Sequence, residues 1–100
     1  MIKCLFLFLM SISLAANTNS LYKRKCMSCH GKKAEGKKSQ KAPRLAGQHA
    51  WYIEDQVKLI RDKKRTSGHS KRMYPFVKKL TNAEIKELAD YLEKLKWVGM

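Results

Sequence analysis

The sequence C-M-S-C-H at positions 26–30 places two thiols three positions apart and an imidazole directly after the second thiol. Residues of these types at this spacing support three kinds of chemistry. A C-x-x-C pair can be a redox dithiol, or it can supply half of a four-ligand zinc site. Followed at once by histidine, it is also the attachment signature of a c-type haem. Each interpretation makes different demands on the rest of the chain.

The zinc and dithiol interpretations find little support elsewhere in the sequence. A zinc site usually needs a second ligand pair at close spacing, whereas His49 and His69 are far apart in the chain. A thioredoxin-like dithiol is expected within a βαβ unit, and the chain has no strand pattern. Haem attachment is therefore the favoured interpretation.

In the haem interpretation the two cysteines and the histidine of the motif each have a chemical role. The thiols of Cys26 and Cys29 would add to the two vinyl groups of the porphyrin, and His30 would be the first axial ligand of the iron. One covalent haem would also fill the core of a chain that is small for a self-sufficient apolar core.

The motif is predicted to lie on a helix that precedes a long loop. Tyr22, Cys26 and Cys29 recur at helical spacing, and Gly31 is expected to end that helix. Residues 32–41 have no apolar period and are rich in lysine, which indicates a solvated loop, and residues 42–47 are expected to form an extended, turn-rich segment.

Two further helices are predicted downstream. Residues 51–65 carry an apolar stripe at helical spacing, and residues 66–72 indicate a polar loop. Thr81 and Glu84 form a capping box, and the helix that follows it is expected to extend its apolar face to Trp97 and to end at Gly99. The predicted fold class is all-α, with three main helices and long loops.

The N-terminus has the pattern of a secretory signal peptide. A short basic start precedes an apolar run from Cys4 to Ala16, which is short for a membrane span. We expect residues 1–16 to be the signal peptide and residues 17–100 to be one domain, exported to the periplasm. An uncleaved N-terminal anchor is the alternative.

The chain is strongly basic, with 22 Lys and Arg against 8 Asp and Glu. A charge of this size bears on association with acidic surfaces and not on fold. Nucleic acid is the usual partner of such a chain, but export argues against it. An acidic protein partner or an anionic membrane surface remains.

Five segments, taken in order, resemble a small class I (monohaem) bacterial cytochrome c. They are C-M-S-C-H-G, A-P-R-L-A-G-Q, Y-I-E-D-Q-V-K-L-I-R, R-M-Y-P-F and L-T-N-A-E-I-K-E-L-A-D-Y-L. The resemblance implies three main helices and long loops wrapped around one covalent haem. It also implies that Met73 is the second axial ligand of the iron. His69, earlier in the same loop, is the alternative ligand.

The resemblance also implies the surroundings of the haem. The Pro43 carbonyl would accept a hydrogen bond from the ring nitrogen of His30 that does not bind iron. Tyr22 and Tyr91 would pack where the first and last helices cross. The expected wall of the haem pocket consists of Leu45, Tyr52, Val57, Ile60, Phe76, Leu88 and Leu92, for which a place in a plain core is an equally good description.

The expected function is that of a soluble, monomeric periplasmic carrier of single electrons with His/Met-ligated haem iron and no catalytic residue. Lysines at the haem edge would steer it onto acidic patches of an oxidase, reductase or peroxidase. The candidates for this role are Lys32, Lys41, Lys71 and Lys78. One alternative is a haem module with a labile sixth ligand that binds a small gas or performs peroxidase chemistry. Another is a basic binding module in which the motif is incidental.

Overall fold

The computed structural model describes residues 13–97 and the side chains of residues 18–97. Within this range the elements are α1 (Ser13–Lys25), α2 (Met27–His30), the 3-10 helix η2 (Lys38–Gln40), α3 (Ala50–Arg61), the 3-10 helix η3 (Gly68–Met73), α4 (Tyr74–Val77) and α5 (Asn82–Lys94). The described part contains no strand, only an isolated bridge between Lys37 and Ala42. The predicted all-α class with three main helices, here α1, α3 and α5, is confirmed.

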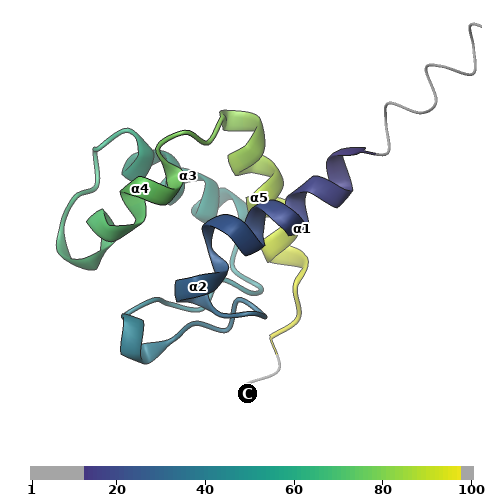
Figure 1. Cartoon of the computed structure of the whole chain (residues 1–100), viewed down its shortest axis with the longest axis horizontal. Coiled ribbons are helices and arrows are strands. Elements are labelled where there is room, and N and C mark those ends of the chain that lie inside the picture. Colours follow the sequence, from purple (N-terminus) through teal and green to yellow (C-terminus); the bar gives the residue numbers. More distant parts are fainter. Residues whose placement is uncertain (1–12, 98–100) are drawn as a thin grey trace, which may run out of the picture.

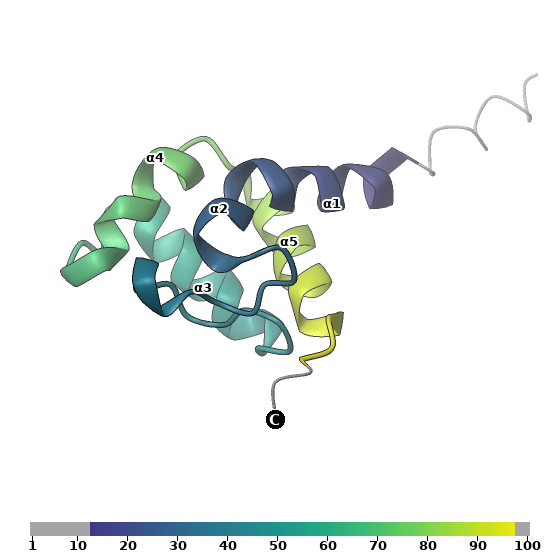
Figure 2. The ribbon, with the colours of Figure 1, turned by 60° about the horizontal axis from the view of Figure 1, so that its bottom comes forward.

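The core lies where α5 packs against α1 and α3 (Figures 1 and 2). α5 buries one apolar face at helical spacing, and α3 and α1 bury shorter stripes against it. α4 also packs against α3. The large buried side chains that these three helices contribute to the core are Leu21 and Tyr22 from α1, Ile53 and Ile60 from α3, and Ile85, Leu88 and Leu92 from α5.

The start of α5 is as predicted, but its end is not. The Thr81 hydroxyl accepts a hydrogen bond from the Glu84 amide at 3.1 Å, and the Glu84 carboxylate accepts one from the Thr81 amide at 2.9 Å. This reciprocal capping box confirms the prediction. The helix was expected to continue to Trp97, but it ends at Lys94 because Leu95 adopts an extended conformation.

α3 is shorter than predicted. The expected helix over residues 51–65 ends at Arg61, because Asp62 leaves helical geometry and Lys63 takes a positive φ of 59°. The N-terminus of α3 is capped by a side chain from α5. The Ala50 amide donates a hydrogen bond to a carboxylate oxygen of Glu93 at 2.8 Å. His49 precedes the helix without a side-chain capping bond.

The first predicted helix is divided in two. Cys26, at φ −124° and ψ −32°, separates α1 from the single turn of α2, although amide-to-carbonyl bonds continue through the break. The predicted packing of Tyr22 on Tyr91 is confirmed, with ring centroids 6.0 Å apart. α1 and α5 therefore cross through an aromatic contact.

Two further segments bear on the predictions. Residues 66–72 were expected to form a polar loop, but most of them belong to the 3-10 helix η3. No helix in the described residues is long and apolar enough to cross a membrane. Most of the predicted signal peptide lies outside the described residues, and α1 begins at Ser13, ahead of the predicted cleavage after Ala16.

Candidate haem site

The C-x-x-C-H motif occupies the break between α1 and α2 and the whole of α2. Cys26 and Cys29 are free thiols and both are partly exposed. Gly31 ends α2 with a positive φ of 97°, a conformation that side chains disfavour. A side chain of α1 holds the backbone at the end of α2. The buried Tyr22 hydroxyl donates a hydrogen bond to the Gly31 carbonyl at 2.6 Å.

His30 is buried, and only 5% of its surface is exposed. Its Nδ1 lies 2.8 Å from the carbonyl oxygen of Pro43. Because a carbonyl can only accept, Nδ1 carries the proton, and Nε2 keeps its lone pair for a metal. Burial lowers the pKa of His30 below its ordinary value, and the bond to Pro43 partly opposes this. The imidazole is thus held neutral, as a metal ligand must be.

The Pro43 carbonyl is held in place by the loop that follows α2. The amides of Leu45 and Ala46 both donate to the Ala34 carbonyl, at 2.9 and 3.0 Å. Gly36 has a φ of 85°, and a Cβ on it would lie 2.7–2.9 Å from the backbone of residues 42–44. Only glycine allows this close approach, which brings residue 43 next to His30.

The electrostatics of the thiols differ from those of a redox dithiol. Burial raises the pKa of the Cys26 thiol to about 12, and neighbouring Lys25 opposes this only in part. Reactive C-x-x-C pairs instead lower the pKa of one cysteine, since the thiolate is the nucleophile. The described residues also contain no cluster of three or more His, Cys, Asp or Glu that could hold a metal ion. These two observations give no support to the dithiol and zinc interpretations.

Met73 ends η3 and is half-buried against the hydrophobic core. α2 and the segment η3–α4 lie in the same half of the molecule, on the left of Figures 1 and 2. The two segments are also linked through a loop, because Arg72 donates a hydrogen bond to the Gln40 carbonyl of η2. His69, the alternative ligand, is exposed on η3.

The residues predicted to line the pocket fall into three groups by burial. Ile60, Leu88 and Leu92 are fully buried in the core. Leu45 and Val57 are half-buried against it, together with Cys26 and Met73. Tyr52 and Phe76 remain 44% and 41% exposed.

The donor set therefore fits a covalently bound haem. It comprises two partly exposed thiols one helical turn apart, a neutral imidazole directed by a carbonyl and a methionine sulfur at the core. A family model described as Cytochrome c matches residues 15–96. The chain belongs to the cytochrome c family. Membership implies a covalently attached c-type haem and the all-α class I fold.

Curated relatives agree with this family. The chain is 39% identical to cytochrome c-552 of Acidithiobacillus ferridurans over 72 residues. These residues cover 71% of this chain and 31% of that protein. It is 35% identical over 66 residues to cytochrome c-554(548) of Halomonas halodenitrificans, which is 66% of this chain and 78% of that protein. It is 35% identical over 74 residues to the thiosulfate dehydrogenase electron acceptor of Thiomonas intermedia, which is 74% of this chain and 33% of that protein. The chain spans about a third of the first and third relatives.

Two contacts of this cytochrome were not found from the sequence. One is the bond from Arg72 to the Gln40 carbonyl, and the other is a cation–π contact between Arg44 and Trp97, with the guanidinium carbon 3.9 Å from the ring centroid. Each of these contacts joins segments that are distant in the sequence, so no periodicity or motif predicts it.

Proposed function

We propose that this protein is a periplasmic carrier of single electrons, with His30 and Met73 as axial ligands and Cys26 and Cys29 as the haem attachment points. A c-type haem supplies one redox-active iron that alternates between Fe(II) and Fe(III). The protein's part is to hold both axial positions, so that the iron changes charge without changing ligands. The proposal assigns no catalytic residue.

The observation that carries this proposal is the arrangement at His30. A buried neutral imidazole whose Nδ1 proton is bound by Pro43 presents Nε2 in a fixed direction. The hydrogen bond also raises the basicity of the ligand, which favours the oxidised metal. Met73 would offset this, because a thioether ligand raises the reduction potential.

The covalent attachment is tested by expressing the full chain in a bacterial periplasm together with haem-maturation proteins. We expect the intact mass to increase by one haem and the haem to resist acid–acetone extraction. Cys26→Ala with Cys29→Ala should abolish retention, whereas Ser28→Ala, between the two cysteines, should not. Haem that extracts freely from the unaltered protein would refute the assignment.

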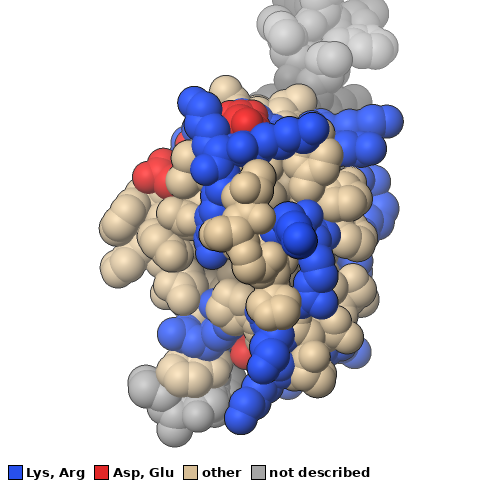
Figure 3. Space-filling model, turned by 90° about the vertical axis from the view of Figure 1, so that its left-hand side faces the viewer, with Lys and Arg blue, Asp and Glu red and all other residues tan. Residues whose placement is uncertain are grey.

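The charge of the described residues is distributed unevenly. α3 with Asp62, together with α5, carries seven of the eight carboxylates and four cations, a net charge of −3. The other residues within 18–97 carry 17 cations and one carboxylate, a net charge of +16. Figure 3 shows Lys and Arg spread over the side of the molecule where α4 lies, with few acidic groups.

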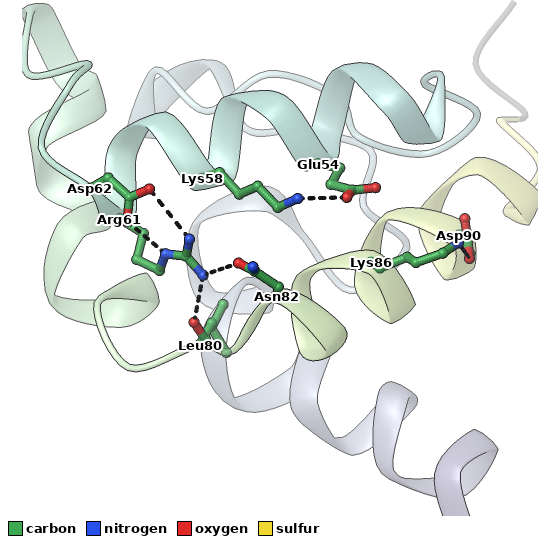
Figure 4. Close-up of polar contacts among 8 residues, drawn as sticks. All are labelled: Glu54, Lys58, Arg61, Asp62, Leu80, Asn82, Lys86 and Asp90. Atoms are coloured by element: carbon green, nitrogen blue, oxygen red, sulfur yellow. Dashed lines mark hydrogen bonds and ion pairs between the residues drawn. The ribbon is translucent and has the colours of Figure 1, made fainter.

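The ion pairs of the described residues lie in the region that holds most of the carboxylates. In the described part, the ion pairs are Lys58–Glu54 at 2.8 Å, Arg61–Asp62 at 2.9 Å and Lys86–Asp90 at 3.1 Å, all on α3 and α5 or directly after α3 (Figure 4). The positive charge of the described residues outside α3, Asp62 and α5 is therefore available to interact with partners. We infer that acidic surfaces of a redox protein are those partners, steered from a distance. An anionic membrane surface is a second candidate, and nucleic acid is not proposed.

The lysines proposed to act in docking are Lys32, Lys41, Lys71 and Lys78, all of which are exposed. They come from the loop after α2, from η3 and from the segment after α4. Both sides of the candidate haem site therefore contribute cations. This placement supports a docking face around the site.

Export by a signal peptide at residues 1–16, followed by one domain at residues 17–100, is also proposed. It is supported by the apolar run in the sequence and by the need to attach haem outside the cytoplasm. Cleavage after Ala16 would remove the first turn of α1 and leave its buried residues Leu21 and Tyr22 in place. N-terminal sequencing of the exported protein tests the site of cleavage.

A further inference from the structure

The chain beyond α5 turns back towards the loop that holds Pro43. α5 ends at Lys94, and Leu95 adopts an extended conformation at φ −71° and ψ 133°. Its amide still donates to the Leu92 carbonyl at 3.2 Å. The same Leu92 carbonyl accepts a hydrogen bond from the Gly47 amide at 2.9 Å, which joins the end of α5 to the end of segment 43–47.

Trp97 lies on the side chain of Arg44, which directly follows Pro43. The guanidinium carbon of Arg44 is 3.9 Å from the centroid of the indole ring. The same guanidinium donates to the Ala46 carbonyl at 2.5 Å, so Arg44 also braces its own segment. Trp97 is only 38% exposed as a result, whereas Trp51 at the start of α3 is 64% exposed.

Segment 43–47 thus has two sides with different contacts. On one side, Leu45 and Ala46 bond to Ala34, and Pro43 bonds to His30. On the other side, Gly47 bonds to α5 and Arg44 stacks on Trp97. Gly47 takes a positive φ of 76°, a backbone conformation that side chains disfavour. Displacement of the outer side would be transmitted directly along this short segment to the Pro43 carbonyl.

We propose that Trp97 is a positioning residue for His30. Through Arg44 it holds segment 43–47, so that the Pro43 carbonyl keeps its hydrogen bond with Nδ1. This inference rests on the proposed role of His30 as an axial ligand. Loss of the contact lengthens the hydrogen bond, which makes the imidazole a weaker donor and raises the reduction potential.

The test compares Trp97→Ala with Trp51→Ala in the haem-loaded full-length protein. Trp51 is a matched control, since it is also an exposed tryptophan but contacts His49 and Tyr52 instead of segment 43–47. The first readout is the exchange rate of the His30 Nδ1 proton, measured by nitrogen-15 NMR of the reduced protein. The second readout is the midpoint potential.

For Trp97→Ala we expect exchange to be about threefold faster, the factor that a cation–π contact at a half-exposed site supports, together with a higher potential. Trp97→Phe, which keeps an aromatic face, should restore both values towards those of the unaltered protein. In an Arg44→Leu background, Trp97→Ala should have no further effect. Trp51→Ala should change neither readout.

The inference is overturned if Trp97→Ala leaves both readouts unchanged, or shifts them no more than Trp51→Ala does. If Trp97→Ala does not retain haem, Trp97→Leu, which keeps apolar cover without the aromatic face, is judged by the same two readouts. Failure of the proposed axial role is distinguishable, because the unaltered protein would then lack the Nδ1 signal of an iron-bound imidazole. A purely structural role of Trp97 would lower the resistance to guanidinium without moving the potential.

Discussion

The hydroxyl of Tyr22 on α1 donates a hydrogen bond of 2.6 Å to the carbonyl of Gly31, which directly follows the candidate iron ligand His30. Tyr22 is 1% exposed, and its burial raises the pKa of the phenol well above the ordinary value. The tyrosine is therefore a permanent donor at physiological pH. It ties the end of the haem-binding helix to the α1–α5 crossing, where its ring packs against Tyr91.

Tyr22→Phe should destabilise the haem-loaded protein. The substitution keeps the ring but leaves the buried Gly31 carbonyl without its donor, at a cost of about 1–3 kcal/mol in the free energy of unfolding. Guanidinium unfolding measures this change. Tyr91→Phe is the matched control, because its hydroxyl makes an exposed contact of 3.4 Å with Asn19 and should cost much less. Equal losses in the two variants would contradict the assigned role.

Arg72→Gln should make the sixth ligand more labile. Arg72 directly precedes Met73 and anchors η3 to the Gln40 carbonyl, so its removal frees the segment that carries the sulfur. We expect tighter binding of added imidazole by the ferric protein, by about fivefold if the lost bond contributes about 1 kcal/mol. Absorption titration measures this affinity.

Lys71→Gln is the control for that experiment. It removes the same charge from the preceding position of η3, and Lys71 is exposed. An equal gain in imidazole affinity for both variants would assign the effect to charge and not to the contact with Gln40.

The charge asymmetry predicts where substitutions slow electron transfer. Lys71→Gln with Lys78→Gln should lower the bimolecular rate with an acidic redox partner and flatten its salt dependence. The decrease should lie at the lower end of the roughly 10- to 1,000-fold effects that whole-protein fields have on association. Lys86→Gln with Lys94→Gln removes the same charge from α5, where carboxylates are in excess, and should have little effect. Stopped-flow kinetics at several ionic strengths measures both pairs, and a salt-independent rate would contradict steering.

The parts of the fold that local sequence determines were predictable. The capping box at Thr81 and the apolar stripe that follows it are both local patterns, and the structure has them as expected. The chemistry of the C-x-x-C-H motif is equally local. The motif led to haem once the rest of the sequence offered neither a second zinc-ligand pair nor a strand pattern, and family membership confirms that cofactor.

The ends of helices were less predictable, because they depend on backbone turns and on distant contacts that the apolar pattern does not encode. α3 was expected to reach Arg65, but the amides of Lys64 and Arg65 both turn back to the Leu59 carbonyl. α5 was expected to reach Trp97, but that tryptophan instead packs on Arg44, from a segment much earlier in the chain. No helical propensity encodes such a contact.

The ferric absorption spectrum is the most direct test of whether His30 and Met73 both bind the haem iron of a stable electron carrier. We predict a weak long-wavelength sulfur-to-iron band in the unaltered protein. This band should persist in Met27→Ala and His69→Ala and disappear in Met73→Ala. In a separate measurement, the unaltered reduced protein should not bind carbon monoxide. Absence of the band from the unaltered protein, or its survival in Met73→Ala, would contradict this ligation. Ready binding of carbon monoxide would instead indicate an open or labile iron site.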